Sequence, residues 1–436
     1  MVIMLADDII IRPENYGAIL FHKRKGTMIE IDKEAYDFVR YIKKEEIIDT
    51  LEWDSKAADQ ELHLFIQQMV KEEFFLRLPT GILNKKTNVY KPMGDMTTQI
   101  NTSSLSAPET VHLAITWRCG NKCWDCYIER HKDQIKREMN TKELLKVIDK
   151  ISDFGVFQIA VGGGEPLIRD DIEEILSHAS HKALTIHLTS GRHDISDELL
   201  TILGRYLTVL QIGIRNEELL KPQGKDVENL CRIADFMKKA NTVIGANVIV
   251  DTYCIEHFDV MINTLEMIGF QTITLLRYKP SVDKESFNRF RPSYSQMIRF
   301  KQLLTERVQM NRDISYRIDC SFAFLEKDMT EELAEYRGIR GCVAGSRIIS
   351  VAPDGSVYPC SQMVGRDYKA GNLTEDSMEV IWEKSEVLIN QRKYKCSEVF
   401  KNSICGSCNA KGYCGGCRIF GEDEGQAAEY CMEEKL

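Results

Sequence analysis

Short apolar runs alternate with longer amphipathic stretches over residues 110–276 of the chain. Apolar runs of about four to eight residues favour buried strands, and apolar residues at three- and four-residue spacing favour helices. The predicted strands are 111–116, 158–161, 184–188, 209–214, 243–250 and 273–276. The helices predicted between them include 141–154, 170–180, 226–240 and 255–268. Six such repeats predict an α/β fold, a partial (β/α)6 TIM barrel with its chemistry at the carboxyl ends of parallel strands.

A different pattern fills residues 1–78. Alternating apolar and polar positions predict strands at 9–12, 18–22 and 27–31, followed by helices at 33–44, 45–51 and 59–73. Three strands followed by three helices predict a winged-helix-like domain. A DNA-binding role is disfavoured because the last helix carries Glu61, Glu72 and Glu73 and few basic residues.

The remaining segments have no regular repeat. Residues 79–109 combine Pro, Gly, Ser and Thr and predict a linker ahead of the barrel at 110–311. Residues 312–341 predict a bridging region with one strand-like run at 314–318, and residues 342–436 form a cysteine-rich domain.

Composition narrows the class of protein. A chain of 436 residues is long enough for several domains, and its net charge of −9 argues against a generic binder of nucleic acid or of anionic membranes. No apolar run approaches about 18 residues, and the N-terminus has no signal-peptide pattern, so a cytoplasmic location is expected. Fourteen cysteines in a reducing compartment favour metal binding over disulfides.

Three of those cysteines, Cys119, Cys123 and Cys126, follow the first barrel strand at a spacing of Cys-x3-Cys-x2-Cys. Three thiolates can hold a 4Fe-4S cluster and leave one iron open, whereas four would close a metal site. The alternatives are an incomplete zinc site or three unrelated core cysteines. The next strand ends in Gly162-Gly163-Gly164-Glu165, where glycines allow close approach of a ligand and the carboxylate suits an ammonium group. Alone, that motif would be an ordinary glycine-rich turn.

A second group of cysteines lies near the C-terminus, and its members are Cys342, Cys360, Cys405, Cys408, Cys414, Cys417 and Cys431. Paired Cys-x2-Cys motifs are typical of zinc ribbons, so spacing alone leaves zinc open. Glycines between the cysteines would let the backbone wrap a compact inorganic group.

Cys119, Cys123 and Cys126, followed one strand later by Gly163-Gly164-Glu165-Pro166, resemble the radical S-adenosylmethionine (SAM) enzymes over residues 110 to about 310. The resemblance implies that SAM binds the open iron and yields a 5′-deoxyadenosyl radical. It also implies SAM contacts from Gly162, Ser190, Asn247 and Tyr127, although a turn serine and a capping asparagine are equally good readings of Ser190 and Asn247. The sequence departs from the family at Asp125, where an aromatic residue is usual.

The C-terminal cysteines resemble the SPASM extension of radical SAM proteins, which carries two auxiliary 4Fe-4S clusters. By this resemblance Cys405, Cys408, Cys414 and Cys431 hold the distal cluster, and Cys342, Cys360 and Cys417 hold the proximal one. Two clusters need eight thiolates and this set supplies seven. Cys320 is the candidate for the eighth, with Cys396 second; an open iron would instead favour a thioether-forming enzyme.

The N-terminal order of strands and helix resembles the peptide-recognition element of ribosomal-peptide maturases, in which the third strand's edge binds a leader peptide. The three-part layout therefore implies a maturase of a ribosomally made precursor peptide, most like the streptide-type Lys-Trp cyclases. The alternatives are a thioether-forming maturase, an anaerobic sulfatase maturase, or an iron-sulfur electron carrier. The expected partners are the precursor peptide and a flavodoxin or ferredoxin-type electron donor, with no nucleic acid and no membrane. No catalytic base can be named.

Overall fold

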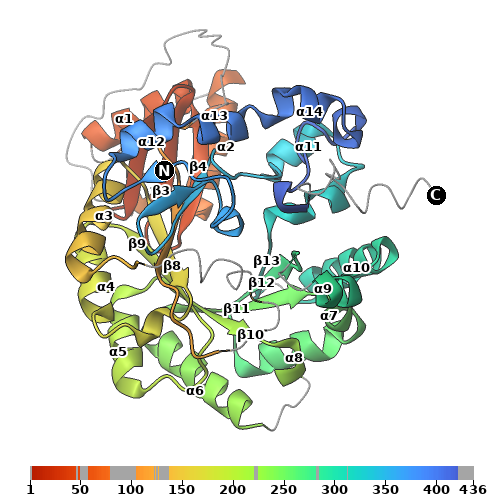
Figure 1. The fold of residues 1–436 in the computed structure, drawn as a ribbon. Helices are drawn as coiled ribbons and strands as arrows, with labels where there is room; N and C mark the ends of the chain where they lie inside the picture. Colours follow the sequence, from red (N-terminus) through yellow and green to blue (C-terminus); the bar gives the residue numbers. More distant parts are fainter. Residues whose placement is uncertain are drawn as a thin grey trace. The chain divides into compact units, whose positions relative to one another are not determined.

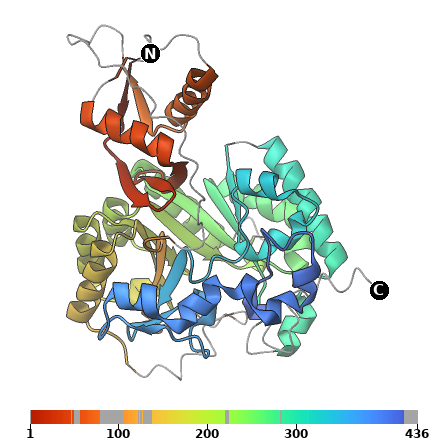
Figure 2. The ribbon, with the colours of Figure 1, turned by 90° about the horizontal axis from the view of Figure 1, so that it is seen from above.

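The computed structural model describes residues 2–45, 48–49, 57–78, 105–121, 123, 126, 137–219, 224–280, 284–311 and 313–420. The chain divides into two compact units, Met1–Ser106 and Ala107–Leu436 (Figures 1 and 2). Most of the predicted linker, residues 79–104, lies outside the described residues, as do Tyr127, Asp125 and Cys431.

The first unit contains two three-stranded antiparallel sheets. One is the predicted meander, formed by β2 (Ile9–Glu14), β3 (Gly17–His22) and β4 (Thr27–Asp32). The other has the order β5-β1-β6 and consists of β1 (Val2–Leu5), β5 (Ile48–Asp49) and β6 (Phe75–Leu78). Because β3 is central in the meander, β2 and β4 are its edges.

Two helices, α1 (Lys33–Glu45) and α2 (Ala57–Lys71), complete this unit. Its core is aromatic: the rings of Phe38 and Phe75 meet edge to face, with centroids 6.3 Å apart. The predicted helix over 45–51 is wrong at Ile48–Asp49, which pairs with β1 instead. Strand pairing with a segment distant in the chain decides this stretch, and local helix propensity is too weak a preference to oppose it.

A ten-stranded sheet organises the second unit. Its centre consists of six parallel strands in chain order: β7 (Thr110–Thr116), β8 (Gln158–Gly163), β9 (Thr185–Ser190), β10 (Val209–Ile214), β11 (Val243–Val250) and β12 (Thr272–Arg277). These are the six predicted strands, and they confirm the α/β partial-barrel fold class. Their carboxyl ends lie at one edge of the sheet, where a barrel enzyme places its chemistry.

The sheet extends beyond these six strands on both sides. β13 (Ser315–Ile318), predicted as part of a separate bridge, pairs in parallel with β12. On the other side β14 (Ile348–Val351) pairs in parallel with β7, and the antiparallel strands β15 (Ser356–Tyr358) and β16 (Gly371–Asn372) follow. The cysteine-rich region therefore shares a continuous sheet with the barrel.

Helices line the outside of the barrel strands (Figure 1). They are α3 (Thr141–Asp153), α4 (Ile172–His181), α5 (Asp197–Tyr206), α6 (Lys225–Lys239), α7 (Thr252–Glu256), α8 (Phe258–Ile268), α9 (Lys284–Phe290) and α10 (Tyr294–Met310). α3 begins with a capping box between Asn140 and Glu143 and buries Leu144, Val147 and Ile151 on one face. The single helix predicted over 255–268 is instead two, α7 and α8, which meet at His257.

The remaining C-terminal region contains several short helices. They are the 3₁₀ helix η4 (Cys320–Glu326) and the α-helices α11 (Glu331–Tyr336), α12 (Met378–Lys384), α13 (Glu386–Arg392) and α14 (Glu398–Lys401). Across the described ranges, no helix has both the length and the apolar character that a membrane span requires.

Candidate active site

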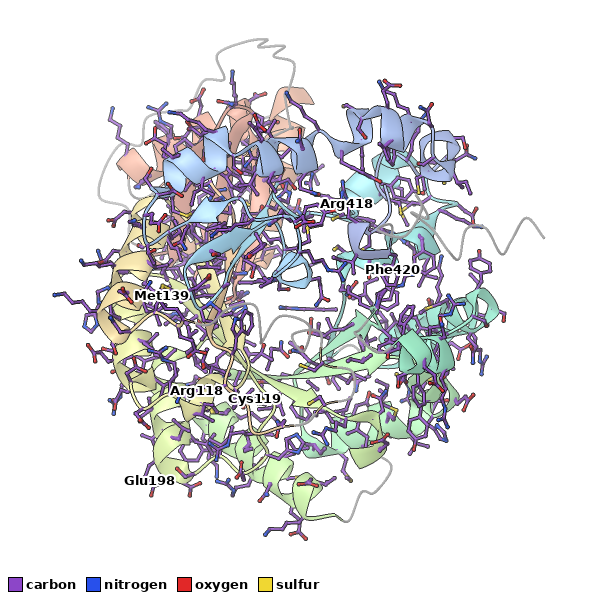
Figure 3. All side chains as sticks on the ribbon, in the orientation of Figure 1. Arg118, Cys119, Met139, Glu198, Arg418 and Phe420 are labelled. Atoms are coloured by element: carbon purple, nitrogen blue, oxygen red, sulfur yellow. The ribbon has the colours of Figure 1, made fainter. Side chains whose placement is uncertain are left out.

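The loop that leaves β7 carries the first cysteine motif, and Figure 3 shows Arg118 next to Cys119 on it. Cys119, Cys123 and Cys126 are half-buried and form no disulfide, and the Cys126 amide donates to the Cys123 carbonyl over 3.3 Å. Free thiols that are neither fully buried nor paired in disulfides remain accessible to an inorganic group.

Glu138 fixes the start of this loop. Its carboxylate accepts hydrogen bonds of 3.0 Å from the Thr116 hydroxyl and 2.6 Å from the Trp117 amide. Thr116 Oγ1 in turn accepts from the Arg118 amide over 3.0 Å. Glu138 is not among the residues predicted from the sequence. It is a single carboxylate just ahead of a helix cap, and nothing in the sequence around it indicates a contact with a loop 21 residues earlier.

The glycine motif after β8 lies directly against the cysteine loop. The Gly164 amide donates to the Thr116 carbonyl over 2.8 Å, and the Glu165 amide donates to the Arg118 carbonyl over 2.9 Å. A Cβ on Gly164 would lie 2.3 Å from the Arg118 oxygen, so a side chain there would force the two loops apart. Gly162 differs, because a Cβ there would meet nothing within 4 Å. The structure thus brings both predicted motifs together and leaves open space beside Gly162.

Glu165 is buried, with only 2% of its surface exposed. Its carboxylate accepts hydrogen bonds from the Leu167 amide (3.1 Å), the Ser190 hydroxyl (2.9 Å) and the Gly191 amide (2.9 Å). Burial raises the pKa of this carboxyl above its ordinary range, although these hydrogen bonds act in the opposite direction. A carboxylate has about four acceptor positions, so three are used within the protein and about one remains for an ammonium group.

Ser190 and Asn247 occupy different places in the barrel. Ser190 ends β9, is buried, donates to Glu165 and accepts from the Arg192 amide over 3.0 Å. Asn247 is half-buried in the middle of β11, in register with Gly213 and Thr274 of the neighbouring strands. The structure therefore joins Ser190 to the glycine motif and leaves Asn247 two strands away. Contact of either residue with SAM stays a prediction.

Arg215 is a further charged group at the cysteine motif. Its Nη2 atom donates to Cys123 Sγ over 3.6 Å from the position just after β10. It lines a pocket with an empty volume of about 450 Å³, together with Asn216, Asp251 and Tyr253. Arg215 is not among the residues predicted from the sequence. Its position could have indicated a site residue, because functional side chains of barrel enzymes follow the carboxyl ends of the strands.

The proximal cysteines of the C-terminal region include the predicted eighth thiol. Cys320 and Cys342 are hydrogen-bonded to each other; this bond raises the pKa of Cys320 and lowers that of Cys342. Cys417 interacts electrostatically with Cys342, as does Cys360. Cys342, Cys360 and Cys417 pack against one apolar cluster, and Cys320 is bonded to the first of them. Cys320 and Cys396, the two candidates for the eighth thiol, are both exposed, and the one bonded to Cys342 is Cys320.

The described cysteines among those predicted for the distal cluster line a cavity with an empty volume of about 610 Å³, part of it open to solvent. Cys405, Cys408 and Cys414 border it, as do Cys320 and Cys417. Gly415 and Gly416 have φ angles of +68° and +70°, which favour glycine, and they turn the chain sharply between Cys414 and Cys417. Among the described side chains, no three Cys, His, Asp or Glu residues converge as a ready-made site for a single metal ion.

Comparisons with known proteins agree with this arrangement. Residues 113–265 match the model of the radical SAM superfamily, and residues 342–409 match SPASM, an iron-sulfur cluster-binding domain. The chain is therefore a radical SAM enzyme with a SPASM domain, which confirms the resemblance predicted from its two cysteine regions. Its cofactors are accordingly SAM, the 4Fe-4S cluster of the radical SAM domain and the auxiliary iron-sulfur clusters of the SPASM domain.

Individual relatives are distant in sequence. The AdoMet-dependent heme synthase of Methanosarcina barkeri is 23% identical over 331 residues, which cover 72% of this chain and 92% of the relative. The mycofactocin maturase MftC of Mycobacterium tuberculosis is 21% identical over 323 residues, with coverage of 72% and 79%.

Solved structures share the fold. SuiB of Streptococcus suis bound to its precursor peptide SuiA has a TM-score of 0.67 at 16% identity, and the match covers 98% of this chain and 99% of SuiB. The enzyme anSMEcpe with bound AdoMet and the Kp18Cys peptide has a TM-score of 0.58 at 17% identity, with coverage of 75% and 95%.

The residues present fit the cofactors of this family. Soft thiolates are the ligands that iron-sulfur clusters take, and the described cysteines of both regions are not joined in disulfides. The open space at Gly162 and the remaining acceptor position of Glu165 suit a ligand with an ammonium group at the cysteine loop.

Proposed function

We propose that this chain is a maturase that installs an intramolecular cross-link, of the carbon-carbon Lys-Trp type, in a ribosomally made precursor peptide. The observation that carries the proposal is the extent of the likeness to SuiB, which covers 98% of this chain and therefore includes the N-terminal unit. That structure contains a precursor peptide. The match to anSMEcpe covers only 75% of this chain.

We assign recognition of the leader peptide to residues 1–78, and specifically to β4. This strand pairs with β3 on one side, and β3 is the only strand that it pairs with among the described residues. The opposite edge of the meander, β2, contains Pro13, which has no amide to donate. An unbroken row of backbone groups makes β4 the better edge for an added peptide strand.

The cofactor ligands follow the sequence motifs. We assign Cys119, Cys123 and Cys126 to the SAM-binding cluster, and the SAM contacts to Gly162, Gly163, Gly164, Glu165, Ser190, Asn247 and Tyr127. We assign Cys320, Cys342, Cys360 and Cys417 to the proximal auxiliary cluster and Cys405, Cys408, Cys414 and Cys431 to the distal one. SAM and its cluster, when bound, supply a 5′-deoxyadenosyl radical that removes a hydrogen atom from the substrate.

The protein's own residues place and protect this chemistry. Glu138 holds the cysteine loop at the end of β7, and Glu165 with Ser190 joins the ends of β8 and β9 beneath it. The barrel around them would exclude water from a reactive radical. Thiols that remain reduced suit the cytoplasm, which we propose as the compartment, with a flavodoxin or ferredoxin-type protein as electron donor.

The thioether alternative is disfavoured by the hydrogen bond between Cys320 and Cys342. A thioether-forming enzyme would need an open iron in the proximal cluster to bind a substrate thiolate. A fourth thiol beside Cys342 would occupy that coordination position. The sulfatase-type alternative does not use a unit such as residues 1–78.

Two measurements test the proposal. The anaerobically reconstituted protein, incubated with SAM and dithionite, should release 5′-deoxyadenosine, which an electron carrier would not do. With its precursor peptide it should yield a product lighter by two hydrogen atoms, with the new bond between Lys and Trp in tandem mass spectra.

Strand addition at β4 has its own readout. Leader peptides carrying one backbone N-methyl group at successive positions should lose affinity for the reconstituted enzyme with a period of two, because alternate amides of an added strand face the sheet. Loss of affinity without that period would contradict the assignment of β4.

A further inference from the structure

A partly buried ion pair joins the end of a barrel strand to the bridging segment that carries Cys320. Lys279, two residues beyond the end of β12, places its Nζ atom 2.5 Å from Asp319 Oδ2, and each side chain is 15% exposed. Water and salt screen a charge in such a partly buried position much less than a charge at the surface.

Asp319 is rigidly placed immediately before Cys320. Its Oδ1 atom accepts from the Ser321 amide over 2.8 Å and caps η4, while its Oδ2 atom also accepts from the Arg277 amide over 2.9 Å. The carboxylate thus ties the end of β12 to the segment that carries Cys320. Lys279 is held in place by the same carboxylate.

The Lys279 ammonium acts on the proximal cysteines. Burial works to lower the pKa of Lys279, but Asp319 and the Cys417 thiolate outweigh it, so the pKa is raised and the lysine remains charged. Burial raises the pKa of the Cys360 and Cys417 thiols, and Lys279 opposes this effect at both of them. The ion pair with Asp319 holds this cation next to the residue that directly precedes Cys320.

A second cation from the same strand end reinforces this field. Arg277 is 7% exposed and stacks its guanidinium 3.7 Å from the centroid of the Phe420 ring. It lines the cavity between Cys414 and Cys417. The end of one barrel strand thus places a buried arginine and a partly buried lysine near the C-terminal cysteines.

We propose that Lys279 is a positioning residue that holds a fixed positive charge beside the proximal auxiliary cluster and raises its reduction potential. This inference rests on the proposed cluster ligands. A reduced cluster carries one more negative charge than an oxidised one, so a nearby cation stabilises the reduced form. A cluster of raised potential accepts an electron more readily, which suits an acceptor beside a substrate that must be oxidised.

The test is potentiometric EPR on the reconstituted full-length enzyme. Lys279→Met should shift the proximal auxiliary signal to a lower potential, and Lys279→Arg should keep it near that of the unchanged enzyme. Asp319→Asn removes the opposing charge and should shift the potential upward. Opposite shifts of the potential in Lys279→Met and Asp319→Asn indicate an effect of charge. A loss of structure would not shift the potential in opposite directions in these two variants.

Lys411→Met is the matched control. Lys411 borders the same cavity but is exposed, so solvent screens its charge and the potential should not move. Equal potentials for Lys279→Met and the unchanged enzyme, at equal iron and sulfide content, would overturn the inference and leave the proposed function intact. Absence of any auxiliary cluster signal in the unchanged enzyme would overturn both.

Discussion

Ser190 donates a hydrogen bond of 2.9 Å to Glu165, although the two residues follow different strands and lie 25 positions apart. The bond is buried, and Glu165 lies directly against the loop that carries the first cysteine motif. A substitution of Ser190 should therefore affect the cofactor site, because it alters the position of Glu165.

Ser190→Ala should weaken SAM binding and lower the free energy of unfolding by about 1–3 kcal/mol, the cost of leaving a buried charged acceptor short of a donor. Calorimetric titration with SAM and urea denaturation measure the two effects. Ser196→Ala, which removes the cap of α5, is the control: it should cost about 1 kcal/mol of stability and leave SAM affinity unchanged. Equal SAM affinity for Ser190→Ala would contradict a role for this pair in the site.

Glu138→Gln should loosen the cysteine loop, because a neutral amide accepts more weakly from Thr116 and Trp117 than a carboxylate does. We expect the SAM-binding cluster to be lost several-fold faster to an iron chelator, as followed by its visible absorption. Glu143→Gln changes the same residue type in an exposed capping box that glutamine also satisfies, so it should behave like the unchanged enzyme. An unchanged rate in Glu138→Gln would remove Glu138 from the site.

Asp171→Asn should destabilise the barrel by about 1.5–3 kcal/mol, because it breaks a two-bond ion pair of 2.6 and 2.7 Å with the buried Arg169. Arg169 also donates to the Ile115 carbonyl over 2.9 Å, at the end of the strand that leads to the cysteine loop. Urea denaturation of the apoprotein at neutral pH measures this difference.

The same variant predicts a pH dependence. The hydrogen bond from Arg169 holds the pKa of Asp171 below its ordinary value of 3.8. A lowered carboxyl pKa gives stability that is complete above the unfolded value and disappears as pH falls through the folded one. The difference in unfolding free energy between the two proteins should therefore be constant near neutral pH and shrink below pH 3.8. A difference that grew on acidification would contradict this ion pair.

Cys320→Ser should alter the EPR signal of the proximal auxiliary cluster and reduce bound iron, because serine is a poorer iron ligand than a thiolate. Cys396→Ser is the matched control and should change neither quantity, because Cys396 is exposed like Cys320 but the thiol bonded to Cys342 is that of Cys320. The reverse pattern would assign the eighth ligand to Cys396.

The barrel strands could be predicted because each one is a short apolar run in the sequence. The runs of β10 and β11, for example, are bounded by polar turns. The small sheet β5-β1-β6 could not, since it pairs Val2 with Asp49 and with Leu78, and no local pattern records such distant partners. β13 likewise reads as an isolated run, because most of its residues are exposed even though it pairs with β12.

The candidate site shows the same division. Cysteine and glycine motifs have fixed spacings, so Cys119 and Glu165 were recognisable from the sequence. The residues that support them, Glu138 and Arg169, are single charged side chains that contact a strand end far along the chain, and Lys279 pairs with Asp319 in the same way. Only the folded structure shows these contacts.

The pairing of β14 with β7 has a consequence for the order in which the protein is made. Ser350 donates to the His112 carbonyl across 238 residues of chain, so β7 lacks this neighbour until the ribosome has synthesised the C-terminal region. Contacts of such long sequence separation form slowly. The strand that leads into Cys119 therefore reaches its final pairing late in biosynthesis, and we expect a chain truncated before β14 to present β7 as an unprotected, aggregation-prone edge.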